Sequence, residues 1–140
     1  SRRQRQMCIR DRNDTVRLGL DALLGECPGL GGCIFLPGDQ PLLRRESLEA
    51  MVRDFHAQKE TERVILRLGW RAGGAEPLLG SPVLFGSGHF DALRALPEGK
   101  GGGVVIRQHP GCVRAVYAQS AEELEDADTV ERLEALKRFL

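Results

Sequence analysis

The sequence predicts an α/β layered fold with a mostly parallel sheet. Helix patterns and strand patterns alternate along the chain, and the strand patterns are short, continuous apolar runs bounded by Gly and Pro. A continuous apolar run is typical of a strand covered on both faces, as in a parallel sheet flanked by helices. The chain has 140 residues, a length that fits one domain, and it shows no internal repeat.

Two amphipathic helices are predicted in the first half of the chain. The first begins after the capping residues 13–15 and ends before Gly25 and Pro28. Its apolar positions recur at helical spacing: Val16, Leu20, Leu23 and Leu24. The second helix covers residues 44–58, and its apolar face consists of Leu48, Met51, Val52 and Phe55.

Four apolar runs are predicted as strands, at residues 33–36, 64–68, 82–85 and 113–117. The first of them lies between a glycine and a proline, and we expect it to be buried on both faces. The glycine-rich stretch 69–80 is expected to be a link between the second and third strands.

Three further helices are predicted in the second half. One is capped by Ser87 or Gly88 and continues through Leu96, and another covers residues 104–108. A closing helix is capped by Thr129 and reaches the C-terminus, with its apolar face made of Leu133, Leu136 and Leu140.

Residues 1–12 differ from the rest of the chain. They are rich in arginine, poor in apolar residues and without periodicity, so we expect no packed element there. We interpret them as a non-native or disordered basic segment, joined to a native sequence that begins near Asn13. Residues 13–140 then form part of one domain.

The composition excludes several classes of protein. Lys and Arg balance Asp and Glu at 20 each, so no net field favours nucleic acid or an anionic membrane. No apolar run approaches the roughly 20 residues that span a bilayer. The four cysteines match no zinc spacing, and we expect reduced thiols in a cytoplasmic protein.

The first candidate for chemistry is Asp39, which follows the predicted strand 33–36 directly. Ligands of open α/β sheets bind at the carboxyl ends of the strands, and one carboxylate there can begin a magnesium site. The alternative is that Asp39 only starts a turn before Pro41.

The second candidate is the acidic pair Asp126 and Asp128, between the last strand and the closing helix. Alternate residues of an extended segment lie on one side, so both carboxylates can face one ligand. The alternative is a capping role, because acidic side chains are favoured before a helix N-terminus.

The third candidate is the glycine-rich stretch 99–103, which contains Lys100 and precedes a predicted helix. Such a loop can bring backbone N–H groups and a lysine to a phosphate, although the Walker A spacing is absent. A flexible loop is the alternative. The histidines at 56, 89 and 109 are scattered, and we expect surface or capping positions for them.

Five segments, in this order, resemble the motifs of one family. They are Thr15–Leu20 (TVRLGL), Ile34–Leu42 (IFLPGDQPL), Gly80–Phe85 (GSPVLF), Glu98–Gly102 (EGKGG) and Asp126–Thr129 (DADT). The family is that of the MobA-like nucleotidyltransferases, and the resemblance is to its branch of molybdenum cofactor cytidylyltransferases. Ser81 stands where the family has Asn, Gly99 replaces Asp, and Val130 replaces Pro.

The family's opening strand and its triphosphate loop, L-A-A-G-x-S-x-R-M-G, have no counterpart in the chain. The resemblance therefore implies a three-layer, Rossmann-like nucleotidyltransferase fold, of the nucleotide-diphospho-sugar transferase type, truncated at the N-terminus. Without its first strand, the strand 33–36 is expected to lie at an edge of the sheet. We also expect the chain alone to be inactive and prone to aggregate.

For activity, the resemblance implies transfer of CMP from CTP to the phosphate of molybdopterin that carries molybdenum, with release of pyrophosphate. It implies Mg²⁺, with Asp39 as the catalytic residue and first metal ligand and Asp128 and then Asp126 as further ligands. The implied border of the molybdopterin pocket consists of Gly80, Ser81, Pro82, Lys100 and Gly101.

Two alternatives stay open at the level of the sequence. A guanylyltransferase or another nucleotidyltransferase of the same fold would use GTP or a different nucleotide, since base choice depends on loops outside the matching segments. A non-catalytic molybdopterin-binding accessory domain would lack turnover altogether. In each case a molybdenum hydroxylase or its maturation factor is an implied partner.

Overall fold

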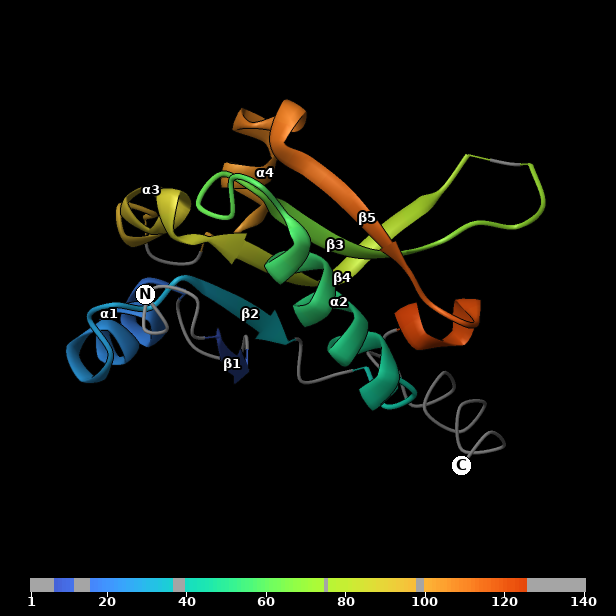
Figure 1. The fold of residues 1–140 in the computed structure, drawn as a ribbon, viewed down its shortest axis with the longest axis horizontal. Coiled ribbons are helices and arrows are strands. Elements are labelled where there is room, and N and C mark those ends of the chain that lie inside the picture. Colours follow the sequence, from blue (N-terminus) through green and yellow to red (C-terminus); the bar gives the residue numbers. More distant parts are fainter. Residues whose placement is uncertain (1–6, 12–15, 37–39, 75, 98–99, 126–140) are drawn as a thin grey trace.

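The computed structural model describes residues 7–11, 16–36, 40–74, 76–97 and 100–125. They form one five-stranded sheet with helices on both faces (Figure 1). The strand order is β1 (Met7–Asp11), β2 (Gly32–Leu36), β4 (Leu78–Gly86), β3 (Ile65–Trp70) and β5 (Val113–Tyr117).

The sheet is mostly parallel, as the sequence predicts. β1 pairs with β2, and β3 with β5, in parallel, while β4 lies between β2 and β3 and runs antiparallel to both. Every strand except β4 therefore runs in the same direction. The carboxyl ends of β2, β3 and β5 lie at the same end of the sheet as the first residues of β4.

Helices cover both faces, which gives three layers. On one face lies α2 (Arg45–Ala57), and the other is covered by α1 (Val16–Glu26), α3 (Phe90–Arg94) and α4 (Gly103–Gln108). Short 3₁₀ turns complete the connections at Ser87–His89, Pro110–Cys112 and Ala121–Leu124. No helix in the described part of the chain combines the length and apolar character that crossing a bilayer requires.

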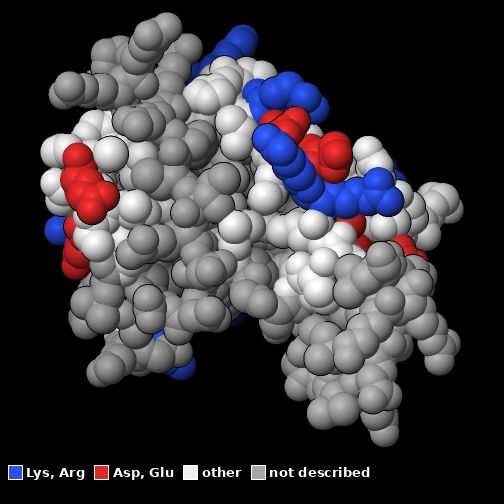
Figure 2. Space-filling view, turned by 90° about the horizontal axis from the view of Figure 1, so that it is seen from below, with Lys and Arg blue, Asp and Glu red and all other residues white. Residues whose placement is uncertain are grey.

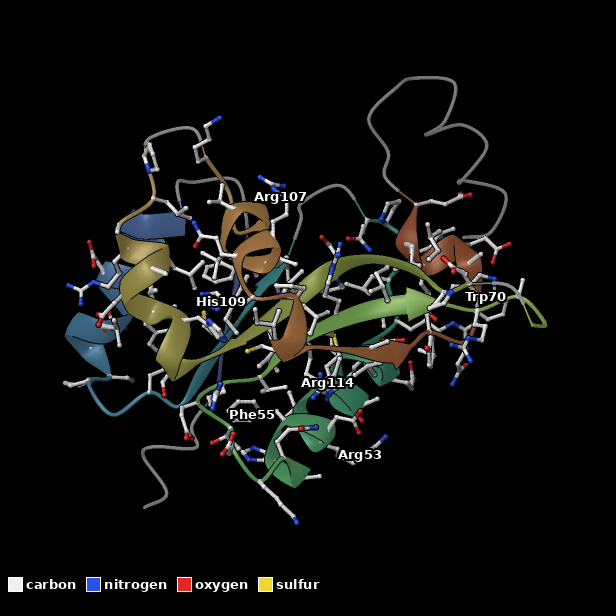
Figure 3. The ribbon with its side chains drawn as sticks, turned by 90° about the horizontal axis from the view of Figure 1, so that it is seen from above. Arg53, Phe55, Trp70, Arg107, His109 and Arg114 are labelled. Carbon is white, nitrogen blue, oxygen red and sulfur yellow. The ribbon has the colours of Figure 1, made fainter. Side chains whose placement is uncertain are left out.

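The central strands divide their side chains between two cores. In β2, Phe35 packs with α1 and α3, whereas Ile34 packs on the opposite face with Met51 and Phe55 of α2. Phe55 points from α2 to the sheet, and Arg53 lies on the exposed side (Figure 3). Full burial of an apolar side chain of this size contributes about 1.5–3 kcal/mol, so these strands need apolar residues at successive positions.

The expectation that residues 1–12 hold no packed element is wrong for Met7–Asp11. This segment forms β1, paired with β2 from Met7–Gly32 to Asp11–Leu36. Strand pairing uses main-chain groups, so an apolar strand with a free edge can pair with an extended segment of almost any sequence. The predicted edge position of strand 33–36 is wrong for the same reason. Whether residues 1–12 are native stays a prediction.

The predicted link at 69–80 is partly wrong as well. β3 continues to Trp70 and β4 begins at Leu78, because a register shift after Arg67 lets the two strands pair again at Gly69–Leu79. A Cβ at Gly69 would lie 2.8 Å from Leu79 Cδ2, so the lack of a side chain permits this approach. The sequence pattern of a stretch so rich in glycine does not predict a strand.

The helix predicted from Ser87 to Leu96 is shorter and irregular. It begins as a 3₁₀ turn at Ser87–His89, and α3 ends at Arg94, with Gly86 in the capping position and no side-chain cap. The predicted closing helix from Thr129 lies outside the described residues. The other predicted helices and strands are confirmed to within two residues, apart from the added ends of β3 and β4.

We predict that Gly86→Ala destabilises the fold by about 1–3 kcal/mol or more, which is typical of overpacking. A Cβ at this position would lie 2.0 Å from the carbonyl oxygen of Thr61 and 2.9 Å from that of Glu62, and backbone cannot move aside as a side chain can. Urea unfolding followed by circular dichroism measures the change. Gly25→Ala is the matched control, because nothing lies within 4 Å of a Cβ there and α1 gains helix propensity. Equal stability of the Gly86 variant and wild type would contradict the prediction.

Candidate functional site

Gln40 joins three of the candidate segments at the carboxyl edge of the sheet. Its side chain is buried, and its Nε2 donates hydrogen bonds to the carbonyl oxygens of Ser81 (2.9 Å) and Glu123 (2.8 Å). Gln40 follows Asp39 directly, Ser81 belongs to the GSPVLF segment, and Glu123 lies three residues before Asp126. The structure therefore brings together segments that are about 40 and 80 residues apart in sequence.

The other end of the Gln40 amide has no partner in the described part of the chain. Oε1 is buried and accepts no hydrogen bond there. The two donated bonds fix which end of the amide is the oxygen, and a buried acceptor left unpaired costs about 1–3 kcal/mol. An unpaired oxygen at this point is thus available to a donor or a cation brought by a ligand.

Asp39, Asp126 and Asp128 lie outside the described residues, so their predicted roles stay predictions. Within the described ranges, no group of three or more His, Cys, Asp or Glu side chains is placed to hold a metal ion.

Glu123 is the buried acid of this region, and sequence reasoning missed it. Its Oε1 accepts hydrogen bonds from Ser47 Oγ (2.5 Å) and the Arg44 amide (3.1 Å), and its Oε2 accepts one from the Gln119 amide (3.0 Å). Arg44 is the N-cap residue of α2 and makes no side-chain cap of its own. Glu123 thus caps α2 from a distant element, where an acidic group is favoured by the helix dipole. A long-range cap leaves no local signal in the sequence.

A cavity of about 160 Å³ lies beside Ser81, on the face opposite α2. Its lining comes from β2, β3, β4 and the start of α4: Phe35, Arg67, Ser81, Val83, Phe85, Gly102, Gly103 and Ile106. A Cβ at Gly102 would lie 2.9 Å from Cζ of Phe85, so this glycine lets α4 close over the sheet. Residues of the GSPVLF segment and of the glycine-rich segment both line this cavity, and their role in substrate binding stays a prediction.

Not all of the predicted substrate-binding residues line this cavity. Ser81 lines it, while Lys100 and Gly101 directly precede its lining glycines, and Lys100 is exposed. Pro82 is buried in β4, and Gly80 packs near Leu124, whose Cδ2 would lie 3.4 Å from an added Cβ.

Arg67 is the second residue that sequence reasoning missed. It lines the cavity, and its Nε and Nη2 donate to the carbonyl oxygens of Gly80 (3.2 Å) and Leu79 (3.4 Å). Burial lowers the pKa of its guanidinium below the ordinary value, although an arginine stays charged at neutral pH. The available signal was a single charge inside the apolar run 64–68, since a buried charge needs a reason.

The histidines differ from the prediction at one position. His89 is buried, its Nε2 lies 2.7 Å from the carbonyl oxygen of Arg63, and its ring contacts Phe85 and His109. His109 directly follows α4 and is exposed, and Figure 3 labels it with Arg107 of that helix. Burial of His89 follows from this ring cluster, which joins elements distant in sequence.

A larger cavity, about 1030 Å³, lies near the opposite edge of the sheet, where β2 and β3 begin. It contains none of the predicted site residues, and ligands of open α/β sheets collect at the carboxyl ends instead. Asp21 and Arg94 line this cavity and form an ion pair, with 2.5 Å between Oδ1 and Nε. We therefore place the candidate site at the smaller cavity.

The charged side chains that the structure describes are of both signs on the face that Figure 2 presents. There, basic and acidic side chains lie next to one another on one part of the face. An ion pair on α2 joins Arg45 Nε to Glu49 Oε1 at 3.1 Å. Charges of opposite sign that lie side by side cancel at short range.

Comparison with known families now decides the class. Residues 8–116 match the model of the MobA-like NTP transferase domain. The chain belongs to this family. The match covers the sheet from β1 into β5, together with the D-Q-P, GSPVLF and glycine-rich segments.

Solved structures support the fold of this NTP transferase domain. Rv0371c from Mycobacterium tuberculosis H37Rv superposes with a TM-score of 0.65 at 21% identity, covering 87% of this chain and 59% of its own. The manganese complex of Rv0371C from the same organism gives a TM-score of 0.64 at 21% identity, covering 91% of this chain and 61% of its own.

A 4-diphosphocytidyl-2C-methyl-D-erythritol synthase gives a TM-score of 0.64 at 16% identity, covering 89% of this chain and 65% of its own. The chain thus spans about three fifths of the length of the solved structures that it matches. A comparison with curated protein sequences gives no match.

We predict that Glu123→Gln destabilises the domain by about 1–3 kcal/mol, the penalty for a buried donor left unpaired. The glutamine has nearly the same shape, but its NH₂ group would replace an acceptor that now faces an N–H or O–H donor. Thermal and urea unfolding measure the loss. Glu76→Gln, at an exposed position between β3 and β4, is the control and should change stability by less than about 0.5 kcal/mol. Two variants of equal stability would show that the long-range cap contributes nothing.

Proposed function

We propose that this domain belongs to a nucleotidyltransferase that transfers CMP from CTP to the phosphate of a molybdopterin-type cofactor. The observation that carries the proposal is the junction at Gln40, which fixes the D-Q-P segment beside Ser81 and next to the chain that leads to Asp126. These are the segments that resemble the metal-binding and acceptor-binding parts of the molybdenum cofactor branch. Because the chain spans about three fifths of its structural neighbours, the activity proposed is that of the whole protein.

The reaction requires positioning more than covalent help from the protein. An oxygen of the acceptor phosphate forms a bond to the α-phosphorus of CTP, the bond from that phosphorus to the bridging oxygen breaks, and pyrophosphate leaves with the electron pair. Fixing both substrates in line removes much of the entropic barrier to such a displacement. The rigid junction at Gln40 supplies a fixed frame for this alignment.

We assign Mg²⁺ binding to Asp39 as first ligand, with Asp128 and then Asp126 completing the protein's share. Carboxylate oxygens are the ligands that this cation prefers, and the unpaired buried oxygen of Gln40 next to Asp39 fits an oxygen-rich cation site. When bound, the ion supplies Lewis-acid neutralisation of charge on the α-phosphate. The manganese complex of Rv0371C supports divalent-cation binding in a protein of this fold.

Acceptor binding is assigned to the cavity beside β4. Ser81 lines this cavity, and we assign its sequence neighbours Gly80 and Pro82, with Lys100 and Gly101 before the lining Gly102, to the border of the acceptor site. The exposed ammonium of Lys100 suits a group that enters from solvent with negative charge. The base of the nucleotide is assigned as cytosine on the resemblance, and the diphosphocytidyl product in the name of one structural neighbour supports it.

We predict that Asp39→Asn in the full-length protein lowers pyrophosphate release from CTP by at least 100-fold, since a neutral amide cannot balance the charge of the cation. The assay supplies CTP, Mg²⁺ and a molybdopterin acceptor, and GTP replaces CTP in a parallel series. Asp54→Asn is the matched control, because Asp54 is an exposed carboxylate on α2. A near-normal rate for the Asp39 variant would reject its role, and acceptor binding without any turnover would favour the accessory domain.

A further inference from the structure

Arg67 is an arginine whose side chain is bonded to the backbone and has no counter-ion among the residues that the structure describes. Its Nε and Nη2 donate to the carbonyl oxygens of Gly80 and Leu79, so the two N–H groups along one edge of the planar guanidinium are used. A guanidinium carries five N–H groups. The two parallel N–H groups at the outer end, on Nη1 and Nη2, bond to no other residue that the structure describes.

The positive charge of this arginine is not balanced within the described ranges. Arg94 and Arg45 each pair with a carboxylate, whereas no described Asp or Glu forms an ion pair with Arg67. Desolvation disfavours the charged form, as the lowered pKa of Arg67 reflects. An anion bound to this guanidinium would compensate the positive charge that burial has partly removed from water.

The cavity beside Arg67 accepts a small group only. Its volume is about 160 Å³, and apart from the Ser81 side chain its walls include Phe35, Val83, Phe85 and Ile106. Sites that hold a whole drug-sized ligand are roughly 300–1,000 Å³, so this one fits a terminal group rather than a nucleotide. The outer fork of a guanidinium matches the spacing of two oxygens of a phosphate.

We propose that Arg67 binds the phosphate monoester end of the acceptor substrate, with Ser81 beside it as a hydroxyl partner. Arg67 is then the residue that selects a phosphorylated acceptor, a role that no feature of the sequence motifs assigns to it. Lys100 is exposed and screened by salt, so its contribution is smaller. The identity of the acceptor rests on the proposed function, but phosphate binding at Arg67 does not.

The test uses the full-length protein and small probes, without nucleotide. Titration calorimetry measures binding of methyl phosphate, of acetate as a carboxylate and of uncharged trimethyl phosphate. We expect methyl phosphate to bind more tightly than the other two probes. We expect Arg67→Met to weaken it at least tenfold and Arg67→Lys, which keeps the charge but loses the fork, at least threefold.

Arg114→Met is the matched control. Arg114 is also a strand arginine bonded to two backbone carbonyls, those of Gly111 and Val113, but it is exposed and lies away from the cavity (Figure 3). We expect this variant to bind methyl phosphate within twofold of wild type. Near-ultraviolet circular dichroism checks the fold of each variant, and Arg67→Lys carries the test if Arg67→Met does not fold.

Three results would overturn the proposal. They are unchanged binding of methyl phosphate by both Arg67 variants, an equal loss on Arg114→Met, and wild-type binding of acetate or trimethyl phosphate as tight as that of methyl phosphate. The proposed function can fail separately. Absence of CTP turnover in the full-length protein, with loss of methyl phosphate binding on Arg67→Met, would reject cytidylyl transfer and keep the phosphate site.

Discussion

The amide of Gln40 links parts of the chain that no local interaction would bring together. It donates to the backbone of Ser81 in β4 and to the backbone of Glu123 in the turn after β5. The bond to Glu123 is buried and the bond to Ser81 is partly buried, and a hydrogen bond broken away from water leaves an unsatisfied group rather than a solvated one. The relative positions of Gln40, Ser81 and Glu123 therefore depend on this one side chain.

Glu123 extends the same junction to α2. Its carboxylate accepts hydrogen bonds from Ser47 and from the backbone of Arg44, which are at the start of α2. A residue about 80 positions later in the sequence therefore fixes where this helix begins. A helix N-terminus and a buried carboxylate suit each other electrostatically.

On the face opposite α2, close apolar packing, rather than polar hydrogen bonds, shapes the cavity. Gly102 approaches the ring of Phe85 where a side chain would not fit, and α4 then covers the end of the sheet beside Ser81. Arg67 remains in this partly buried space because two backbone carbonyls bind it. The domain thus combines a polar junction at Gln40 with a small cavity that Arg67 lines.

The sequence by itself determined the fold class and most of its elements, because continuous apolar runs and helical spacing are local signals of burial on one or two faces. β2, α2 and β5 are confirmed on that basis. Ser81 and the glycine-rich segment line one cavity, and the chemistry assigned to these segments stays a prediction.

Tertiary structure alone decided the pairing of β1 with β2, the extension of β3 and β4 through Gly69, and the burial of Glu123, Gln40 and His89. Each of these depends on a partner far away in the sequence. Arg67 makes the same point, since only the arrangement of β3 beside β4 shows that its charge is held by carbonyls and faces a cavity.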